Sequence, residues 1–130
     1  MARLDDLIEL VDEYQVRFRH PDMLPFTFVP EFDLNVTEPV CPVDAARKGV
    51  YVIFCGEQVI YIGKSSAQKK AIWHRIVDHI YSSKKSNWSG QATHFVAWAV
   101  PDETFFEASA LEEFLIYRLK SELPNNRIGK

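Results

Sequence analysis

Two runs of β-branched and aromatic residues around a glycine-containing turn constrain the fold of this chain more than any other feature. They are residues 50–54 (VYVIF) and 59–62 (VIYI). Such runs predict a β-hairpin. With residues 55–57 as a three-residue loop, Phe54 would lie opposite Gln58, and Tyr51 would lie opposite Tyr61. A shift of one residue would place the two tyrosines on opposite faces, so the register decides whether they can act together.

Apolar residues at helical spacing predict three helices around this hairpin. They span residues 3–18, 67–82 and 104–123, the second with Ser66 as its cap and the third with Thr104 and Glu107 as a capping box. Residues 94–100 predict a third strand, which Pro101 would end.

Residues 20–47 contain five of the seven prolines. This density excludes long regular elements and predicts an extended arm over the core, anchored by Phe26, Phe28 and Phe32. The expected fold class is therefore α/β, of the α+β type, with a central three-stranded antiparallel sheet flanked by helices. We expect residues 48–130 to form this small domain and residues 1–47 to pack on it as an N-terminal helix and proline-containing arm.

The charge of the chain is unevenly distributed along the sequence. The formal net charge is −3, but residues 1–46 hold three basic and ten acidic residues (−7), whereas residues 47–130 hold twelve basic and eight acidic ones (+4). A positive balance suits a phosphate backbone, although +4 is also ordinary for a solvated surface.

The sequence shows no sign of secretion or membrane insertion. The N-terminal residues are acidic, and no apolar run is long enough to cross a bilayer. We therefore expect a cytoplasmic protein that does not bind a membrane. Cys41 and Cys55 have neither metal-binding nor disulfide-framework spacing, so they are expected to be small buried apolar side chains.

Three polar residues lie at or beside apolar helical positions. Arg75 and His79 border the apolar stripe of the second predicted helix, and Glu112 lies on that of the third. A buried carboxylate must reach solvent, become protonated or meet a cation, because an unpartnered buried charge costs several kcal/mol. A divalent metal, Arg75 or another basic neighbour would provide that cation.

These residues fall in an order that resembles the GIY-YIG endonuclease family. Over residues 48–126 the matching features are Gly49-Val50-Tyr51, Tyr61-Ile62-Gly63 ten residues later, Lys64 after it, Arg75-x-x-x-His79, and Glu112 followed by Leu115 and Ile116. Val50 replaces the usual Ile of the first tripeptide. Asn126 matches the family's terminal Asn, although a gap that is one residue shorter than usual leaves Asn125 open.

The resemblance implies a metal-dependent DNA endonuclease that hydrolyses phosphodiester bonds and leaves 5′-phosphate and 3′-hydroxyl ends. One Mg²⁺ (or Mn²⁺) would be held by Glu112, a hard oxygen ligand. Arg75 and Lys64 would contact the phosphate, and Asn126 would complete the site. We expect Tyr51 to act as the general base with Tyr61 and His79 in support, because a phenol needs help to lose its proton at neutral pH.

Two other functions are consistent with parts of the sequence. A catalytically inactive GIY-YIG-like module could bind nucleic acid or a protein, and an interaction protein could use the acidic residues 1–46 as its surface or as a guard over the basic face. In the endonuclease interpretation, loops, the arm, a homodimer or a protein partner would supply the specificity for the DNA target.

Overall fold

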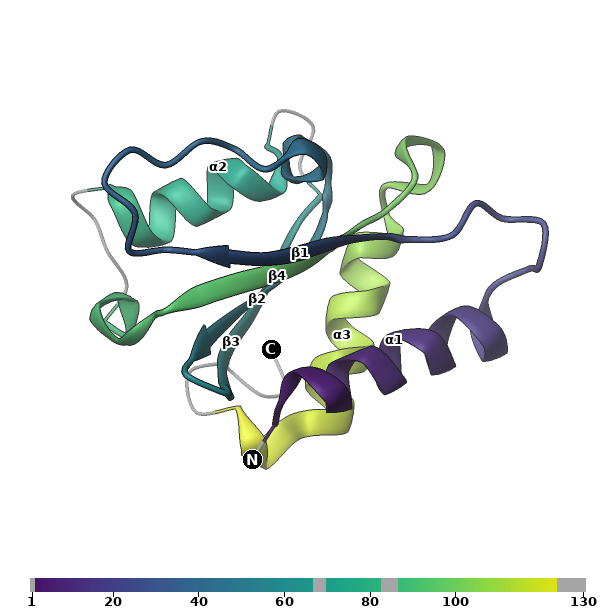
Figure 1. Cartoon of the computed structure of the whole chain (residues 1–130). Coiled ribbons are helices and arrows are strands. Elements are labelled where there is room, and N and C mark those ends of the chain that lie inside the picture. The colour runs from purple at the N-terminus through teal and green to yellow at the C-terminus, as the bar shows by residue number, and fades with distance from the viewer. Residues whose placement is uncertain (1, 67–69, 83–86, 124–130) are drawn as a thin grey trace.

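A four-stranded antiparallel sheet forms the centre of the fold (Figure 1). The structure is a computed structural model, and it describes residues 2–66, 70–82 and 87–123. The strands are β1 (Thr27–Asp33), β2 (Gly49–Cys55), β3 (Gln58–Ser65) and β4 (His94–Ala99), in the spatial order β1-β4-β2-β3. The α+β class agrees with the prediction, but the expected three-stranded sheet is wrong by one strand.

The additional strand, β1, comes from the proline-containing arm. It pairs with β4, and the register shifts between Val29 and Phe32, on either side of Pro30. A proline is tolerated at such an irregularity and on an edge strand, because its missing N–H then breaks no regular ladder. Phe26 is buried, the Phe28 ring lies 5.2 Å from that of Trp98, and the Phe32 ring lies 5.5 Å from that of Phe95, so the three predicted anchors pack on the core in addition to the strand pairing.

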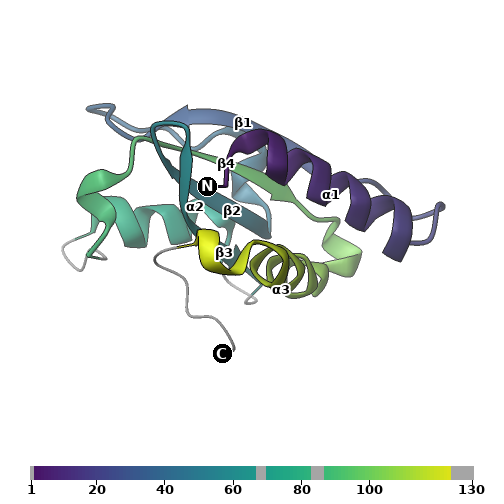
Figure 2. The same ribbon diagram turned by 90° about the horizontal axis from the view of Figure 1, so that it is seen from below.

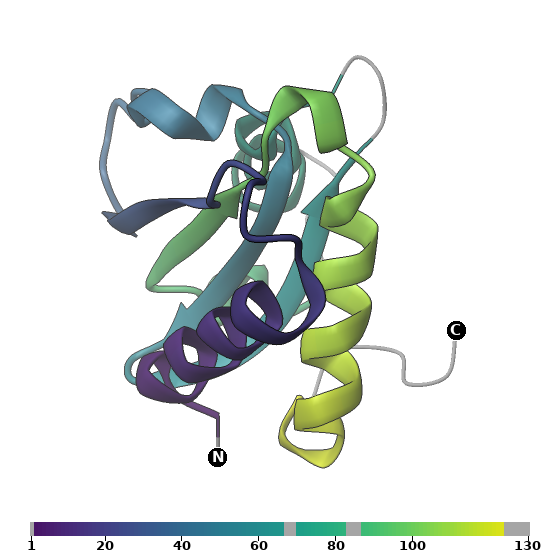
Figure 3. The same cartoon turned by 90° about the vertical axis from the view of Figure 1, so that its right-hand side faces the viewer.

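Two helices cover one face of the sheet, α1 (Leu4–Phe18) and α3 (Glu107–Leu119) (Figures 2 and 3). The apolar side of α1 is buried through Leu7, Leu10 and Val11, which confirms the first predicted helix. The last helix starts three residues later than predicted. Thr104 does donate a hydrogen bond to Glu107 (2.7 Å), but Asp102–Thr104 forms a separate 3₁₀ turn.

The other face is covered by α2 (Ile72–Ile76), which continues as a π-helical turn, Val77–Tyr81. Ile72, Ile76 and Ile80 are buried there, as the apolar spacing predicts. The predicted cap is wrong, because Ala71 precedes α2 and Ser66 instead accepts a hydrogen bond from Lys64 (3.0 Å).

The acidic N-terminal segment is held to the rest of the fold by ion pairs as well as by β1. Arg19 forms two hydrogen bonds to the Glu107 carboxylate (2.7 and 2.9 Å), with both side chains buried, and Arg118 contacts Glu13 (2.5 Å). These contacts favour a structural role for residues 1–46 over that of a removable guard.

Two further expectations concern the surface. Cys41 and Cys55 are free thiols, but Cys55 is exposed and Cys41 only half-buried, so the expectation that both are buried is wrong. Within the described residues, no helix has both the length and the apolar character needed to cross a membrane.

Candidate active site

The pairing of β2 with β3 determines which side chains share a face. The connecting turn is the two-residue Gly56-Glu57, and Gly56 has a φ of +60°, which glycine adopts without strain. Tyr51 lies opposite Gly63, and Tyr61 lies opposite Ile53. The predicted three-residue loop and the direct pairing of Tyr51 with Tyr61 are therefore wrong, although the two tyrosines do share a face.

An irregularity in β3 keeps the tyrosines on that face. Cys55 pairs with Gln58 and Phe54 with Val59, but Ile53 pairs with Tyr61, so Ile60 is an extra residue. A regular hairpin with this turn would direct Tyr61 to the face opposite Tyr51, since side chains alternate along a strand. The bulge restores the alternation. Ile60 and Tyr61 consequently both pack on the face that α2 covers.

Two glycines of the motif are required by close contacts. A Cβ added at Gly63 would lie 2.7 Å from Cε2 of Tyr51 and closer still to its Cζ and hydroxyl oxygen. A Cβ at Gly49 would lie 2.9 Å from the Cα of Ala99 and closer to the carbonyl oxygen of Trp98. Each distance is shorter than a van der Waals contact. Gly63 therefore makes room for the Tyr51 ring, and Gly49 lets β4 approach β2.

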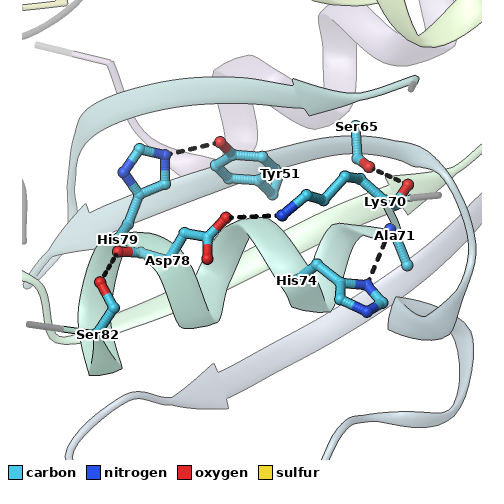
Figure 4. A network of polar contacts seen from close by, with 8 residues as sticks. All are labelled: Tyr51, Ser65, Lys70, Ala71, His74, Asp78, His79 and Ser82. Carbon is cyan, nitrogen blue, oxygen red and sulfur yellow. Dashed lines mark hydrogen bonds and ion pairs between the residues drawn. The ribbon is translucent and has the colours of Figure 1, made fainter. Parts of the chain in front are cut away.

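Tyr51, Tyr61, His79 and Trp88 form one aromatic cluster under α2. The Tyr51 hydroxyl lies 2.9 Å from Nε2 of His79 (Figure 4). The Tyr61 ring is 6.3 Å from that of Tyr51, 5.2 Å from that of His79 and 4.7 Å from the stacked indole of Trp88. Side chains from β2, β3 and the π-helical turn thus meet at one place.

Two residues that position His79 escaped the sequence prediction. Ser89 donates a hydrogen bond to the His79 carbonyl oxygen (2.5 Å), and the Trp88 ring lies 5.1 Å from the imidazole. Both come from residues that the sequence assigns to a loop. The buried Trp88 inside a polar segment was the available signal, because a large apolar side chain there needs a packing partner.

The environment of the cluster determines the protonation states. Burial raises the pKa of Tyr51 above its ordinary value, and the adjacent Tyr61 raises it further while Arg75 opposes the rise. Burial likewise raises the pKa of Tyr61, with Glu112 adding to the effect. Burial lowers the pKa of His79 below its ordinary value, against the pull of Asp78. At neutral pH the phenols are therefore protonated and the imidazole is neutral.

Arg75 lies among these groups with one donor unused. It affects the pKa values of Tyr51, Tyr61 and His79, which places its charge near all three. Its Nε is buried and has no hydrogen-bond partner among the described residues. A buried N–H without an acceptor is costly, so this atom is suited to an anion that enters the site.

Glu112 lies on α3, and Lys64 lies on β3 opposite Val50, so both belong to the sheet face that α3 covers and not to the face of Tyr51. Lys64 donates to Ser109 (2.9 Å) as well as to Ser66, which fixes its amine beside the helix that carries Glu112. Burial raises the pKa of Glu112, and Lys64 acts in the opposite direction. Glu112 also raises the pKa values of both tyrosines, so its charge lies near enough to act on them.

Glu112 could serve as one protein ligand of a divalent cation. The Glu112 carboxylate is half-buried and has no hydrogen bond or ion pair with the described residues, which leaves its oxygens available as hard ligands. The described part of the chain contains no group of three or more His, Cys, Asp or Glu residues arranged for a metal ion. A cation held here would keep most of its water ligands, as Mg²⁺ commonly does. Asn125 and Asn126 lie outside the described residues.

Comparison of the chain with models of known protein families, with curated proteins and with solved structures found no match. The function is therefore argued from the geometry of this site.

Proposed function

We propose that the protein is a metal-dependent DNA endonuclease of the GIY-YIG type. The main support is the Tyr51–His79 hydrogen bond together with the unpartnered Nε of Arg75, because such a pair can relay a proton and such an N–H can bind an anion. Hydrolysis of a phosphodiester needs both functions.

The relay accounts for how a buried tyrosine could serve as a base. The raised pKa of Tyr51 makes a free phenolate scarce at neutral pH. If the attacking water gives its proton to the Tyr51 oxygen while the Tyr51 hydroxyl gives its own to Nε2 of His79, no phenolate needs to accumulate. The lowered pKa of His79 keeps the imidazole neutral and able to accept this proton. Tyr61 packs against both rings and helps to hold them in position.

The remaining residues would bind the phosphate. Arg75 can donate from Nε to a phosphoryl oxygen, and Lys64, oriented by Ser66 and Ser109, adds a second positive charge. Mg²⁺ or Mn²⁺ bound at Glu112 would neutralise charge on the phosphoryl oxygens and the leaving oxygen. Without that ion, the Glu112 carboxylate would repel the substrate.

The test compares Glu112 with its neighbour on α3, the exposed Glu113. Supercoiled and branched DNA would be incubated with the wild-type chain, Glu112→Ala and Glu113→Ala, in Mg²⁺, Mn²⁺ or EDTA. We expect cutting only with a divalent cation, a loss of about 10²-fold or more for Glu112→Ala, as for other groups that stabilise developing charge, and little change for Glu113→Ala.

Two results would contradict the proposal. One is the absence of cutting under all conditions while the protein binds DNA, which would favour the inactive binding module. The other is cutting that Glu112→Ala leaves undiminished, which would exclude Glu112 as the metal ligand.

A further inference from the structure

A concave surface lies at the start of α2, away from the π-helical turn that carries His79. It is a hollow of about 350 Å³ between the 3₁₀ turn Val43–Ala46, the start of α2 and Asp102. The side chains that line it include Arg47, Lys48, Lys70 and His74, and Asp102 is the acidic residue among them. We call this hollow the basic pocket. It shares none of its lining residues with the Tyr51–His79 cluster.

Two donors in the basic pocket are available to a ligand. Lys48 has no ion pair with the described residues, and its amine lies 5.0 Å from the centre of the Phe105 ring. His74 accepts a hydrogen bond at Nδ1 from the backbone N–H of Ala71 (3.1 Å) (Figure 4). A neutral imidazole that accepts at Nδ1 carries its proton at Nε2, so His74 presents an N–H donor.

Arg47 supplies a fixed positive charge in the wall of the pocket. Its guanidinium donates to Thr27 Oγ1 (2.9 Å) and to the carbonyl oxygen of Val100 (3.1 Å), and it lies 3.5 Å from the Asp44 carboxylate. These contacts hold the guanidinium before any ligand arrives, so little side-chain entropy is lost on binding.

Lys70 links the basic pocket to the candidate active site. Its amine lies 3.4 Å from the carboxylate of Asp78, the residue that precedes His79 (Figure 4). The pocket and the Tyr51–His79 pair therefore lie along the same helical segment. At about 1.5 Å per residue, the five steps from His74 to His79 span about 7.5 Å along the axis.

The chemistry of the pocket suits a phosphate group. Arg47 and Lys70 are each paired with a carboxylate, so the donors left for a phosphate are Lys48 and the Nε2–H of His74. The hollow is open and large enough for a phosphate with some of its water. Phosphates of one DNA strand follow each other at about 3.4 Å along the duplex axis, so a strand at the active site would bring further phosphates within reach.

We propose that the basic pocket binds a backbone phosphate of duplex DNA a few nucleotides from the bond at the Tyr51–His79 pair. This inference rests on the proposed nuclease function and adds a second contact to it. The pocket positions the duplex and takes no part in bond cleavage, so its residues affect affinity and salt dependence instead of the chemical step.

The test compares Lys48→Ala with Lys120→Ala. Both lysines lie over an exposed aromatic ring, Phe105 and Tyr117 respectively, but Lys120 is at the far end of α3. Duplex binding would be measured in EDTA over a range of salt concentrations, and unfolding curves would verify that both variants fold. The slope of log affinity against log salt concentration is negative. We expect Lys48→Ala to make it less steep by about 1, for duplexes of any sequence, and Lys120→Ala to leave it unchanged.

Single-turnover cutting in Mg²⁺ separates this inference from the proposed function. The expected result for Lys48→Ala is a higher DNA concentration at half-maximal rate with an unchanged rate at saturation. If Lys48→Ala binds and cuts like the wild type, the pocket proposal is overturned and the nuclease proposal stands. If wild-type binding depends on Lys48 but no DNA is cut, the pocket proposal stands and the nuclease proposal fails. A wild-type chain that binds no duplex overturns the pocket proposal.

Discussion

Replacing Gly63 with alanine tests whether the site depends on the close packing of the two strands. The added Cβ would lie 2.7 Å from Cε2 of Tyr51, whereas carbon atoms prefer separations of about 3.5–4.0 Å. The Tyr51 ring would have to move by about 1 Å to restore that separation. It cannot rotate away freely, because it is 2% exposed and packs against the rings of Tyr61 and His79.

Such a movement would break the hydrogen bond to His79. The 2.9 Å distance between the Tyr51 hydroxyl and Nε2 would lengthen by up to about 1 Å, which is enough to leave hydrogen-bond range. Overpacking costs about 1–3 kcal/mol, and the lost hydrogen bond costs about 1 kcal/mol. The free energy of unfolding should therefore fall by about 2–4 kcal/mol, and displacement of a catalytic group by about 1 Å should lower the cutting rate about 10²-fold.

Gly90→Ala is the matched control, because a Cβ at Gly90 would meet nothing within 4 Å. Urea unfolding would give the stability of both variants, and nicking of supercoiled DNA in Mg²⁺ would give their activity. Equal stability of Gly63→Ala and Gly90→Ala would refute the packing argument. Adding Tyr51→Ala to Gly63→Ala should remove most of the cost of the alanine, since the ring that it meets is then absent.

Four further predictions concern single groups. Tyr51→Phe should change the unfolding free energy by only about 1 kcal/mol and reduce cutting about 10²- to 10⁴-fold in the nicking assay, because it removes the hydroxyl but not the ring. The rate of DNA cutting should fall on acidification only below the ordinary pKa of histidine, because burial lowers the pKa of His79. Burial raises the pKa of Glu112 in the folded state, so ionisation of this carboxyl group lowers the stability of the fold as the pH rises through that pKa. Glu112→Gln should therefore raise the melting temperature at pH 8 in EDTA, and this gain should vanish at pH 4. Arg19→Ala should cost about 3–5 kcal/mol in urea unfolding because it leaves the buried Glu107 charge unpaired, whereas Arg19→Met with Glu107→Leu should recover most of that loss.

The sequence identifies the strands of the hairpin and the shared face of its tyrosines, but not their pairing. The actual register differs from the predicted one by two residues, from Tyr51 opposite Tyr61 to Tyr51 opposite Gly63. A shift of two preserves the face, since side chains alternate with a period of two. The shorter turn and the bulge at Ile60 depend on packing between distant segments, which alternation of residue types does not encode.

The sequence patterns did not predict the fourth strand or the π-helical turn, for a similar reason. Pro30 indicates a break in regular structure. A strand forms there because residues on both sides of Pro30 pair with β4, which the sequence pattern does not reveal. The π turn that carries His79 is held by a hydrogen bond from Ser89 and by contact with Trp88. Both residues lie outside the apolar spacing that predicts the helix. Glu112 was identifiable because it lies on an apolar stripe, and Arg75 and His79 because they border one, whereas Ser109 and Ser66 resemble ordinary surface serines.

The extra residue in β3 has a consequence for how motifs are interpreted. If Ile60 were instead part of a regular ladder with the same two-residue turn, Tyr61 would pair with Val52, which is also an acceptable hairpin. The phenol of Tyr61 would nevertheless emerge on the wrong side of the sheet. A chain could thus keep both tripeptides, letter for letter, with the same number of residues between them, and still lack the tyrosine cluster, so the pairing of the strands carries information that the tripeptides alone do not.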